Sequence, residues 1–448
     1  MAKNEAKRLL ILASKLGYQT RSFAEAAQRL GVEVAFGTDR CHQLEDPWAD
    51  GALPLHFEQP EQAAQAIVAH AKSRLMDAIL ALGDRPTVTG ARAARALGLR
   101  YNSPESVENC RSKLRQREVL RAGGLPVPDF FSFAFGEPLE AVLGRVRFPC
   151  VIKPLSLAAS QGVIRANDAG EFAAAVQRLR RLLESPEIQA TREPWLDRLL
   201  VERYIPGEEV ALEGLLDDGR LRVLAIFDKP DPLEGPFFEE SIYVTPSRLP
   251  AALQSRIADC AGRSARALRL THGPLHSEFR LHQEGPWVLE VAPRPIGGLC
   301  SRALRFGPDA NGELILLEEL LVRHALGLPG RELPREGQAA GVMMIPVPRS
   351  GILERVEGLE EAAATPGVEG IHITARLHDY IAAWPEGSSY LGFIFARHAT
   401  PEEVERALRR AHSKLRFTLT PRLPVEHPAR HVTKMLQAGR PERNSSIW

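Results

Sequence analysis

Residues 275–298, LHSEFRLHQEGPWVLEVAPRPIGG, constrain the fold most, because they predict two adjacent strands with acidic side chains on one face. The first strand alternates between a mostly apolar and a polar set of side chains, which is the period-two pattern of a half-buried strand. The polar set includes Glu278. A second strand over 287–294 alternates in the same way and places Val288 on the side of Glu290.

The expected pairing of these two strands brings the two glutamates together. A five-residue loop at 282–286 pairs Leu281 with Trp287, and the same register places Glu278 directly opposite Glu290. Their Cβ atoms would then lie roughly 5 Å apart, and the two carboxylates would repel each other. The sequence therefore predicts a cation between them.

Two carboxylates that share hard cations, with an arginine on the same face, form an arrangement that binds a magnesium nucleotide. A solvated polar face is the alternative, and for an acidic pair alone it is the commoner arrangement. The remaining motifs of the chain decide between the two.

Length and charge exclude several classes of protein. A chain of 448 residues predicts about three domains. The 57 basic and 56 acidic residues leave a net charge of +1, so no long-range field attracts nucleic acid or an anionic membrane. No apolar run is long enough to span a bilayer, and the N-terminus has no leader pattern. The five cysteines form no CxxC pair, which predicts buried thiols and a cytoplasmic protein.

The first hundred residues alternate strands and helices. Strands are predicted over 8–13, 32–38 and 76–82, with helices over 60–73 and 88–97 between or after them. This order predicts a mostly parallel sheet with helices on both faces. The turn after the first strand lacks GxGxxG, so a tightly bound dinucleotide is not expected. The domain is either structural or holds part of a substrate.

The middle of the chain carries lysines and acids near flexible loops. A helix is predicted over 106–122, with Lys113 inside it, and Lys153 lies in a strand before the small loop 158–162. Such loops let backbone N–H groups approach phosphate oxygens, although an ordinary turn is the alternative. A later strand is interrupted at Pro206–Gly207.

A long proline-rich loop follows the strand over 221–227, and a loop of this length is usually functional or mobile. Glu239 or Glu240 in this loop could recognise a substrate ammonium group, but a surface acid is the commoner arrangement. Residues 338–420 predict a small α+β domain. The tail over 421–448 is expected to pack loosely or to be partly disordered.

Taken in order, these motifs resemble those of the ATP-grasp superfamily, and within it the L-amino acid ligases, which join two amino acids at the expense of ATP. The resemblance rests on Lys113, the Lys153 strand and its small loop, VERYIPGEEV, the paired acids and EVAPRPIGG. It implies an α/β and α+β chain with an ATP-grasp fold. The implied domains are a Rossmann-like pre-ATP-grasp domain at 1–105, an ATP-grasp domain at 106–335 with a mobile lid at about 150–208, an amino-acid-ligase-type domain at 336–420, and a tail at 421–448.

The resemblance also implies roles for individual residues. The phosphates, adenine and ribose of ATP would be bound by Lys113, Lys153, Ser160, Gly162, Glu202, Ile205 and Glu209. The cofactor metal, Mg²⁺ or Mn²⁺, would be bound by Glu278 and Glu290. Arg294 would stabilise the acyl phosphate and the tetrahedral state that follows. Lys229 would contact the γ-phosphate or a carboxylate, with a solvated loop lysine as the alternative.

One position departs from the family pattern. Many superfamily members have asparagine where this chain has Ala292, so one metal ligand is missing. His276 would face Ala292 across the hairpin, and either water or His276 could fill the gap. Mg²⁺ readily keeps several waters. The change therefore bears on the second metal and not on ATP binding.

The leading expectation is an ATP-dependent carboxylate–amine ligase that acts on small-molecule substrates, with a homodimer as one expected assembly. A carboxylase that activates bicarbonate is the first alternative, and the ligase-type C-terminal domain and the lack of a Met-Lys-Met motif disfavour it. A non-catalytic ATP-binding protein is the second alternative. The sequence does not identify the acid or the amine.

Overall fold

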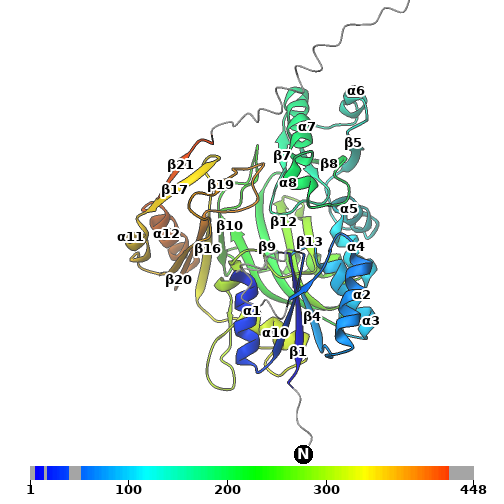
Figure 1. The fold of residues 1–448 in the computed structure, drawn as a ribbon. Helices are drawn as coiled ribbons and strands as arrows, with labels where there is room; N and C mark the ends of the chain where they lie inside the picture. Colours follow the sequence, from blue (N-terminus) through cyan, green and yellow to red (C-terminus); the bar gives the residue numbers. More distant parts are fainter. Residues whose placement is uncertain (1–5, 15–17, 40–51, 423–448) are drawn as a thin grey trace, which may run out of the picture.

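A computed structural model describes residues 6–14, 18–39 and 52–422 (Figure 1). The predicted tail falls almost entirely outside the described residues. The N-terminal domain is a parallel sheet in the order β3-β2-β1-β4. Its elements are β1 (Arg8–Ala13), α1 (Tyr18–Arg29), β2 (Glu33–Thr38), β3 (Ala52–Pro54), α2 (Pro60–Ala71), β4 (Ala78–Leu82) and α3 (Thr87–Leu97). The predicted parallel βαβ domain is confirmed.

The helix predicted over 106–122 is two helices. α4 (Pro104–Arg111) and α5 (Lys113–Ala122) are separated by Ser112, whose backbone is extended with φ −96° and ψ 118°. The Ser112 hydroxyl accepts a hydrogen bond from the Arg115 backbone and so caps α5. The prediction of a single helix was therefore wrong, because an apolar pattern alone does not detect a serine cap. Lys113 begins a helix instead of lying inside one.

A second, four-stranded sheet forms a separate lobe, which we call the lid sheet. Its strand order is β5-β8-β6-β7, and its lobe stands at the top of Figure 1 with α7. The elements are β5 (Phe130–Ala134), α6 (Leu139–Leu143), β6 (Cys150–Pro154), β7 (Ile164–Ala166), α7 (Ala169–Leu183), α8 (Pro186–Gln189) and β8 (Arg198–Arg203). Its own core includes Phe133, Ile152 and Phe172. A lobe with its own core can move as a unit, so the lid stays a prediction with a structural basis.

The largest sheet has eight strands in the order β13-β12-β9-β10-β11-β16-β20-β18. Its strands are β9 (Glu208–Asp217), β10 (Arg220–Lys229), β11 (Ile242–Thr245), β12 (Gly273–His282), β13 (Gly285–Ala292), β16 (Ala339–Ile345), β18 (Val368–Ile373) and β20 (Gly392–His398). Strands from both sides of the predicted boundary at residue 335 hydrogen-bond to one another through β11 and β16. The C-terminal region therefore shares a continuous sheet with the centre of the chain.

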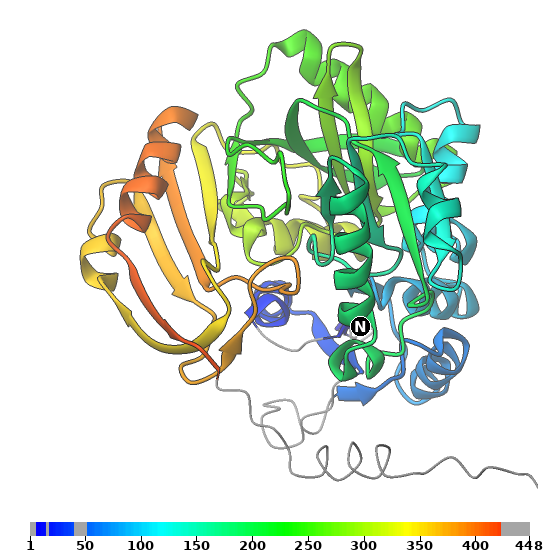
Figure 2. The ribbon, with the colours of Figure 1, turned by 90° about the horizontal axis from the view of Figure 1, so that it is seen from above.

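Helices and short strands cover this sheet. Figure 2 shows α12 on β16 and β20, and α12 begins with a complete capping box at Thr400 and Glu403. The remaining elements are α9 (Ala251–Ala267), η1 (Cys300–Ala303), β14 (Arg305–Phe306), β15 (Ile315–Leu316), α10 (Leu317–Ala325), β17 (Gly351–Glu357), α11 (Leu359–Ala363), β19 (Tyr380–Ile381), α12 (Pro401–His412) and β21 (Arg416–Thr420).

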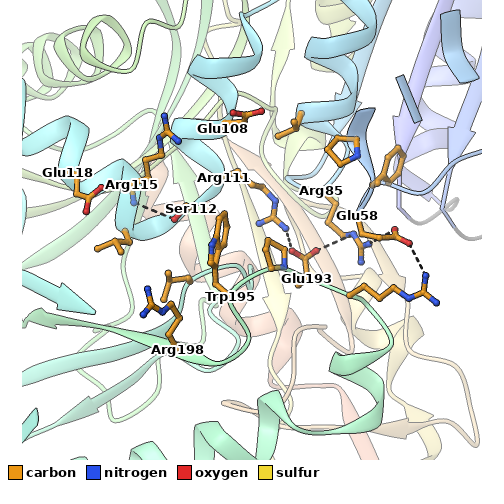
Figure 3. Close-up of a pocket in the computed structure, with 17 residues that line it drawn as sticks. Glu58, Arg85, Glu108, Arg111, Ser112, Arg115, Glu118, Glu193, Trp195 and Arg198 are labelled. Atoms are coloured by element: carbon orange, nitrogen blue, oxygen red, sulfur yellow. Dashed lines mark hydrogen bonds and ion pairs between the residues drawn. The ribbon is translucent and has the colours of Figure 1, made fainter. Parts of the chain in front are cut away.

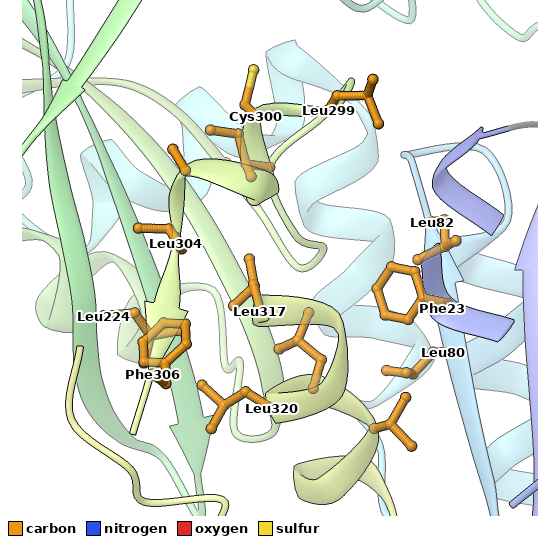
Figure 4. Close-up of a cluster of buried hydrophobic side chains, with 14 of the residues drawn as sticks. Phe23, Leu80, Leu82, Leu224, Leu299, Cys300, Leu304, Phe306, Leu317 and Leu320 are labelled. Atoms are coloured by element: carbon orange, nitrogen blue, oxygen red, sulfur yellow. The ribbon is translucent and has the colours of Figure 1, made fainter. Parts of the chain in front are cut away.

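One hydrophobic core joins the N-terminal domain to the large sheet (Figure 4). Phe23 and Leu80 of the N-terminal domain and Leu317 and Leu320 of α10 belong to the same buried cluster. Burial of large apolar side chains stabilises such a junction by about 1.5–3 kcal/mol per residue. The residues that follow β4 are thereby held beside the large sheet.

The hairpin of β12 and β13 pairs Glu278 with Glu290 and His276 with Ala292, as predicted. The loop prediction was wrong, because Leu281 pairs with Pro286 and His282 with Gly285, which leaves a two-residue turn. A bulge between Glu278 and Phe279 compensates for the shorter loop.

The same bulge changes which side chains of β13 point to each face of the sheet. Val288 is fully buried in an apolar core cluster with Val291, whereas Glu290 lines two cavities on the other side. The prediction that Val288 shares the face of Glu290 was therefore wrong. An extra residue in one strand shifts the alternation of all residues beyond it.

The turn before β9 depends on Gly207. This residue has φ +123°, and a Cβ atom there would lie 2.0 Å from the backbone oxygen of Leu281. We expect Gly207→Ala to lower the free energy of unfolding by about 3 kcal/mol or more, because the cost of the positive φ adds to that of a close backbone contact that cannot move away easily. Thermal melting followed by circular dichroism measures the effect.

Gly219→Ala is the matched control. Gly219 also has a positive φ, +78°, but a Cβ atom at this position would have no heavy atom within 4 Å. Gly219→Ala should therefore lower the free energy of unfolding only by the cost of placing alanine at a positive φ, about 1–2 kcal/mol. Equal losses in melting temperature for the two variants would show that the Leu281 contact is unimportant.

Candidate active site

Eight of the predicted site residues line one cavity of about 100 Å³ between the lid sheet and β9, β12 and β13. We call it the lysine–glutamate cavity. The eight residues are Lys113, Lys153, Ser160, Glu202, Ile205, Glu209, Glu278 and Glu290. The cavity is smaller than the several hundred Å³ that ligand pockets usually offer. Binding of a nucleotide would require the lid sheet to move away.

Of the two predicted lysines of this cavity, Lys153 is buried and Lys113 is half-buried. The Lys153 ammonium group lies 2.6 Å from a Glu202 carboxylate oxygen, and the Lys113 ammonium group donates to the Leu157 carbonyl. Burial lowers the pKa of both lysines, although nearby glutamates oppose this shift. A phosphate group would supply the negative charge that the two ammonium groups favour.

Arg117 is a neighbour that the sequence analysis missed. It is fully buried and donates to Glu202 at 2.7 Å and to the Leu289 carbonyl at 2.6 Å. It lies four residues after Lys113 on α5, so the helical spacing could have revealed it. The Glu202 carboxylate is thus held by two cations, which fixes the position of Lys153.

Lys229 lies among three carboxylates. Its ammonium group is 2.7 Å from Glu209, 2.5 Å from Glu240 and 3.0 Å from Glu278. Burial opposes its charge, but the three acids outweigh burial and raise the pKa of Lys229 well above its usual value. The alternative of a solvated loop lysine was therefore wrong.

Glu240 is half-buried and pairs with Lys229, which the prediction of a surface acid did not anticipate. Burial and the neighbouring glutamates raise the pKa of Glu240 to about 7, although Lys229 opposes this shift. Its second oxygen accepts from the Tyr243 hydroxyl at 2.9 Å. Glu239 instead accepts from the Val347 backbone at 2.9 Å.

The acids fit a hard cation. Glu209, Glu240 and Glu278 each offer an oxygen within 4.8 Å of the other two, and Glu290 faces Glu278 across the hairpin. The Lys229 ammonium group now lies among the first three carboxylates, so a metal ion there would have to replace it. Carboxylate oxygens are the ligands that Mg²⁺ prefers. The sequence analysis named Glu278 and Glu290 and did not place Glu240 with them, because the loop that carries Glu240 has no strand periodicity.

His276 does not offer a metal ligand in this arrangement. Its Nδ1 atom pairs with Glu213, and its Nε2 atom lies 3.4 Å from Glu278. Burial lowers its pKa, but Glu213 outweighs burial and raises the pKa of His276 to about 10. A protonated imidazole has no free lone pair. Of the two groups considered for the gap at Ala292, this favours water.

Arg294 lines a neighbouring cavity of about 390 Å³, which we call the arginine cavity. Its guanidinium group donates to Asp84 at 2.8 Å and lies 3.7 Å from Glu290. Asp84 follows β4 in the N-terminal domain, and Gln19 from the same domain also lines the cavity. The N-terminal domain therefore contributes directly to the candidate site. The carboxyl end of a parallel strand could have indicated Asp84.

The two cavities share a wall. Ser160, Glu278 and Glu290 line both of them. A group held between the two glutamates can therefore be reached from the lysines on one side and from Arg294 on the other.

Gly162 lines neither cavity. Its N–H donates to the Pro385 carbonyl at 2.8 Å, and its φ of +73° suits glycine. A Cβ atom there would lie 2.9 Å from the Pro154 ring. The structure therefore places Gly162 at a packing contact, away from the predicted phosphate site.

The small loop 158–162 docks on residues 384–386 of the C-terminal region. The Trp384 ring donates to the Ala159 carbonyl at 3.1 Å, and Gln161 donates to the Glu386 carbonyl at 2.7 Å. Arg178 of α7 holds the Glu386 carboxylate through two nitrogens, at 2.5 and 2.8 Å. These contacts hold the loop of Ser160 over the cavity.

We expect Glu386→Gln to raise the KM for ATP about two- to fivefold, because an exposed bidentate ion pair contributes up to about 1 kcal/mol. Steady-state kinetics at varied ATP measures this change. Glu184→Gln is the control, since Glu184 forms a similar exposed pair with Arg180 within the same lobe but away from the loop. A KM that rises equally in both variants would contradict the docking role.

A larger cavity of about 520 Å³ contains none of the predicted site residues (Figure 3). Three of its charged groups already pair with one another, because Glu193 accepts from Arg111 and lies 3.2 Å from Arg85. We therefore place the chemistry in the two smaller cavities, where the buried charges converge.

Three family models match the chain. They are the ATP-grasp N-terminal domain at residues 24–99, the ATP-grasp domain at 146–303 and the L-amino acid ligase C-terminal domain 2 at 343–420. Among the helices of the described ranges, none combines the length and the apolar character needed to cross a membrane.

The relatives in sequence include named ligases. An uncharacterised protein of Sinorhizobium fredii is 27% identical over 93% of this chain and 84% of that protein. Carnosine synthase 1 of Gallus gallus is 29% identical over 80% of this chain and 40% of its own length. Alanine–anticapsin ligase of Bacillus amyloliquefaciens is 26% identical over 54% of this chain and 53% of its own length. The chain thus spans about half or less of these two named ligases.

Solved structures of ligases and carboxylases share the fold of this chain. The crystal structure of an L-amino acid ligase from Bacillus licheniformis is similar with a TM-score of 0.74 and 28% identity, over 92% of this chain and 99% of that one. A biotin carboxylase from Campylobacter jejuni, at 15% identity and a TM-score of 0.62 over 92% of each chain, shares the fold alone. The predicted ATP-grasp fold is confirmed, and the chain belongs to the ATP-grasp superfamily as an enzyme that resembles the L-amino acid ligases.

Proposed function

We propose that the chain is an ATP-dependent ligase that joins the carboxyl group of one amino acid to the amino group of another, with release of ADP and phosphate. The observation that carries this proposal is the wall that the two cavities share, Ser160, Glu278 and Glu290. A terminal phosphate bound at this wall would face the lysines on one side. On its other side it would be open to a substrate carboxylate. The domain boundaries, the cytoplasmic location and the homodimer stay predictions.

ATP would occupy the lysine–glutamate cavity once the lid sheet has moved. Lys113 and Lys153 would neutralise phosphate oxygens, Ile205 would contact adenine through its backbone, and Glu209 would bind the ribose. The Glu209 carboxylate now pairs with Lys229 and with Arg280 at 2.9 Å. Nucleotide binding therefore requires this carboxylate to exchange partners, and Lys229 is then free to turn toward the γ-phosphate.

Glu278 and Glu290, with Glu240 beside them, would hold Mg²⁺, which supplies charge neutralisation on the phosphate oxygens. Burial opposes the charge of Glu278, but Lys229 and His276 outweigh it and hold the pKa of Glu278 well below its usual value. Glu278 therefore stays ionised in the closed site.

The substrate carboxylate would attack the γ-phosphoryl group in line, which breaks the bond to ADP and forms an acyl phosphate. The role of the chain in this step is to position the two groups, a contribution that can reach about 7–11 kcal/mol. The lid sheet and the docked loop would keep water away from the acyl phosphate.

The amine of the second amino acid would then attack the acyl carbon and displace phosphate. Arg294 and the N–H groups of Gly297 and Gly298, which line the arginine cavity, would stabilise the oxyanion. Asp84 and Glu240 line the same cavity and offer carboxylates to a substrate ammonium group. A cavity with both a cation and acids suits a zwitterionic amino acid better than bicarbonate, which disfavours the carboxylase alternative.

The proposal is tested by incubating the chain with ATP, Mg²⁺ and pooled amino acids. Phosphate release together with a product whose mass equals two amino acids minus water is the expected result. Phosphate release with bicarbonate in the absence of amino acids would contradict it. Tight ATP binding without turnover across a broad library of acids and amines would favour the non-catalytic alternative.

A further inference from the structure

The far end of the β9–β12 pair carries a cluster of two histidines and one aspartate that the proposed reaction does not use. Asp217 ends β9, His272 precedes β12, and His324 lies on α10. Each of the three side chains offers one ligand atom within 4.8 Å of the other two. Three separate elements therefore bring nitrogen and oxygen ligands to one point.

Both histidines have a buried nitrogen without a partner. His272 is 8% exposed and His324 is 5% exposed. Nδ1 of His272 and Nε2 of His324 have no hydrogen-bond partner among the described residues. Buried polar atoms in folded proteins nearly always have a hydrogen-bond partner, so two unsatisfied ones beside each other require a reason.

The histidines are also held in place. Their ring centroids lie 4.5 Å apart with an angle of 24° between the ring planes. Asn102 accepts from the His272 backbone at 3.0 Å and donates to its carbonyl at 2.7 Å. Such outer contacts orient metal ligands.

The charges of the cluster allow a metal. Asp217 accepts from Arg100 through Oδ1 at 2.8 Å, and its Oδ2 lies 3.9 Å from Arg331, beyond hydrogen-bond distance. One carboxylate oxygen is thus left for a ligand, and the partly exposed Asp217 side chain gives access from solvent.

We propose that Asp217, His272 and His324 form a second metal site that binds Zn²⁺ or a similar borderline transition metal, with water completing the coordination. Two imidazoles and a carboxylate are ligands that Zn²⁺ accepts, whereas Mg²⁺ prefers oxygen alone. His272 lies six residues before Glu278 in the chain. At about 3.3 Å per residue of strand, the two residues are roughly 20 Å apart. The site is therefore distinct from the proposed nucleotide site and independent of the proposed function.

Such a metal would link β9, the start of β12 and α10. α10 packs against α1 of the N-terminal domain and against β12 (Figure 1). A metal that binds the folded chain and not the unfolded one raises the melting temperature. The site would thus stabilise the junction between the N-terminal domain and the large sheet.

The test uses the full chain after treatment with a chelator, with Zn²⁺ or Co²⁺ as the probe and excess Mg²⁺ to occupy the carboxylate cluster. Equilibrium dialysis should show one bound Zn²⁺ per chain, and Co²⁺ should give a visible absorption band of nitrogen and oxygen ligation. His272→Gln, His324→Gln and Asp217→Asn should each weaken binding at least about tenfold. Zn²⁺ should raise the melting temperature of the wild type but not of these three variants.

His282→Gln is the matched control, because Nδ1 of His282 is also buried without a partner among the described residues, whereas its ring packs edge-on against Trp287 and not, in the described part of the chain, against a histidine. It should bind Zn²⁺ as the wild type does. Asp217→Asn changes a partly exposed side chain, so it tests the site even if a histidine variant does not fold. Absence of bound Zn²⁺ in the wild type, or equal binding in wild type and Asp217→Asn, would overturn the proposal.

Discussion

Replacing Glu278 and Glu290 together with glutamine is expected to lower the rate of ATP-dependent phosphate release at least about 1000-fold, which corresponds to about 4 kcal/mol. The two side chains face each other across the hairpin and line both cavities. Glutamine keeps their size but removes two negative charges that would bind the metal. Phosphate release measured with saturating ATP and an accepted pair of amino acids checks the result.

Glu284→Gln is the control for this prediction. Glu284 lies in the exposed turn of the same hairpin and undergoes the same chemical change. Its phosphate release should equal that of the wild type. A double variant that keeps more than about a tenth of the activity would show that these glutamates do not hold the metal.

Replacing Arg294 with lysine is expected to lower kcat about 100- to 1000-fold while the KM for ATP changes little. The guanidinium group lines the arginine cavity and not the lysine–glutamate cavity, so its loss should affect the oxyanion more than nucleotide binding. Lysine keeps the positive charge next to the half-buried Asp84 but cannot form two parallel hydrogen bonds. Steady-state kinetics with ATP and each amino acid varied in turn separates the two effects.

Arg302→Lys provides the comparison, because Arg302 lies in η1 outside both cavities and donates to His372 at 2.7 Å. It should retain the activity of the wild type. An Arg294→Lys enzyme with an unchanged kcat and a raised KM for ATP would assign Arg294 to nucleotide binding instead.

Alternation and motif order were enough to predict much of the site. The predicted pairing of Glu278 with Glu290 is confirmed, but two errors cancelled to give it, because a strict period of two from the actual turn would pair Glu278 with Leu289. The derivation succeeded although its loop was three residues too long, since a bulge restored the register before Glu278. The face of Val288 could not be predicted, because a bulge depends on the neighbouring strand and on packing.

Contacts between segments far apart in the chain could not be predicted from the sequence. Asp84 and Arg294 are 210 residues apart, and the buried core between the N-terminal domain and α10 brings them together. Glu240 lies in a loop, so only the fold shows that its carboxylate meets Lys229. The resemblance to the family assigned Gly162 to the phosphate site, whereas in the structure Gly162 lies close to the Pro154 ring and its N–H donates to the Pro385 carbonyl.

The acyl phosphate is the central claim, and an oxygen-18 label tests it most directly. The chain is incubated with ATP, Mg²⁺ and an amino acid whose carboxylate carries oxygen-18, together with an accepted amine. If the carboxylate attacks the γ-phosphoryl group, one labelled oxygen appears in the released phosphate for each amide bond formed. Amide formation with unlabelled phosphate would contradict the account.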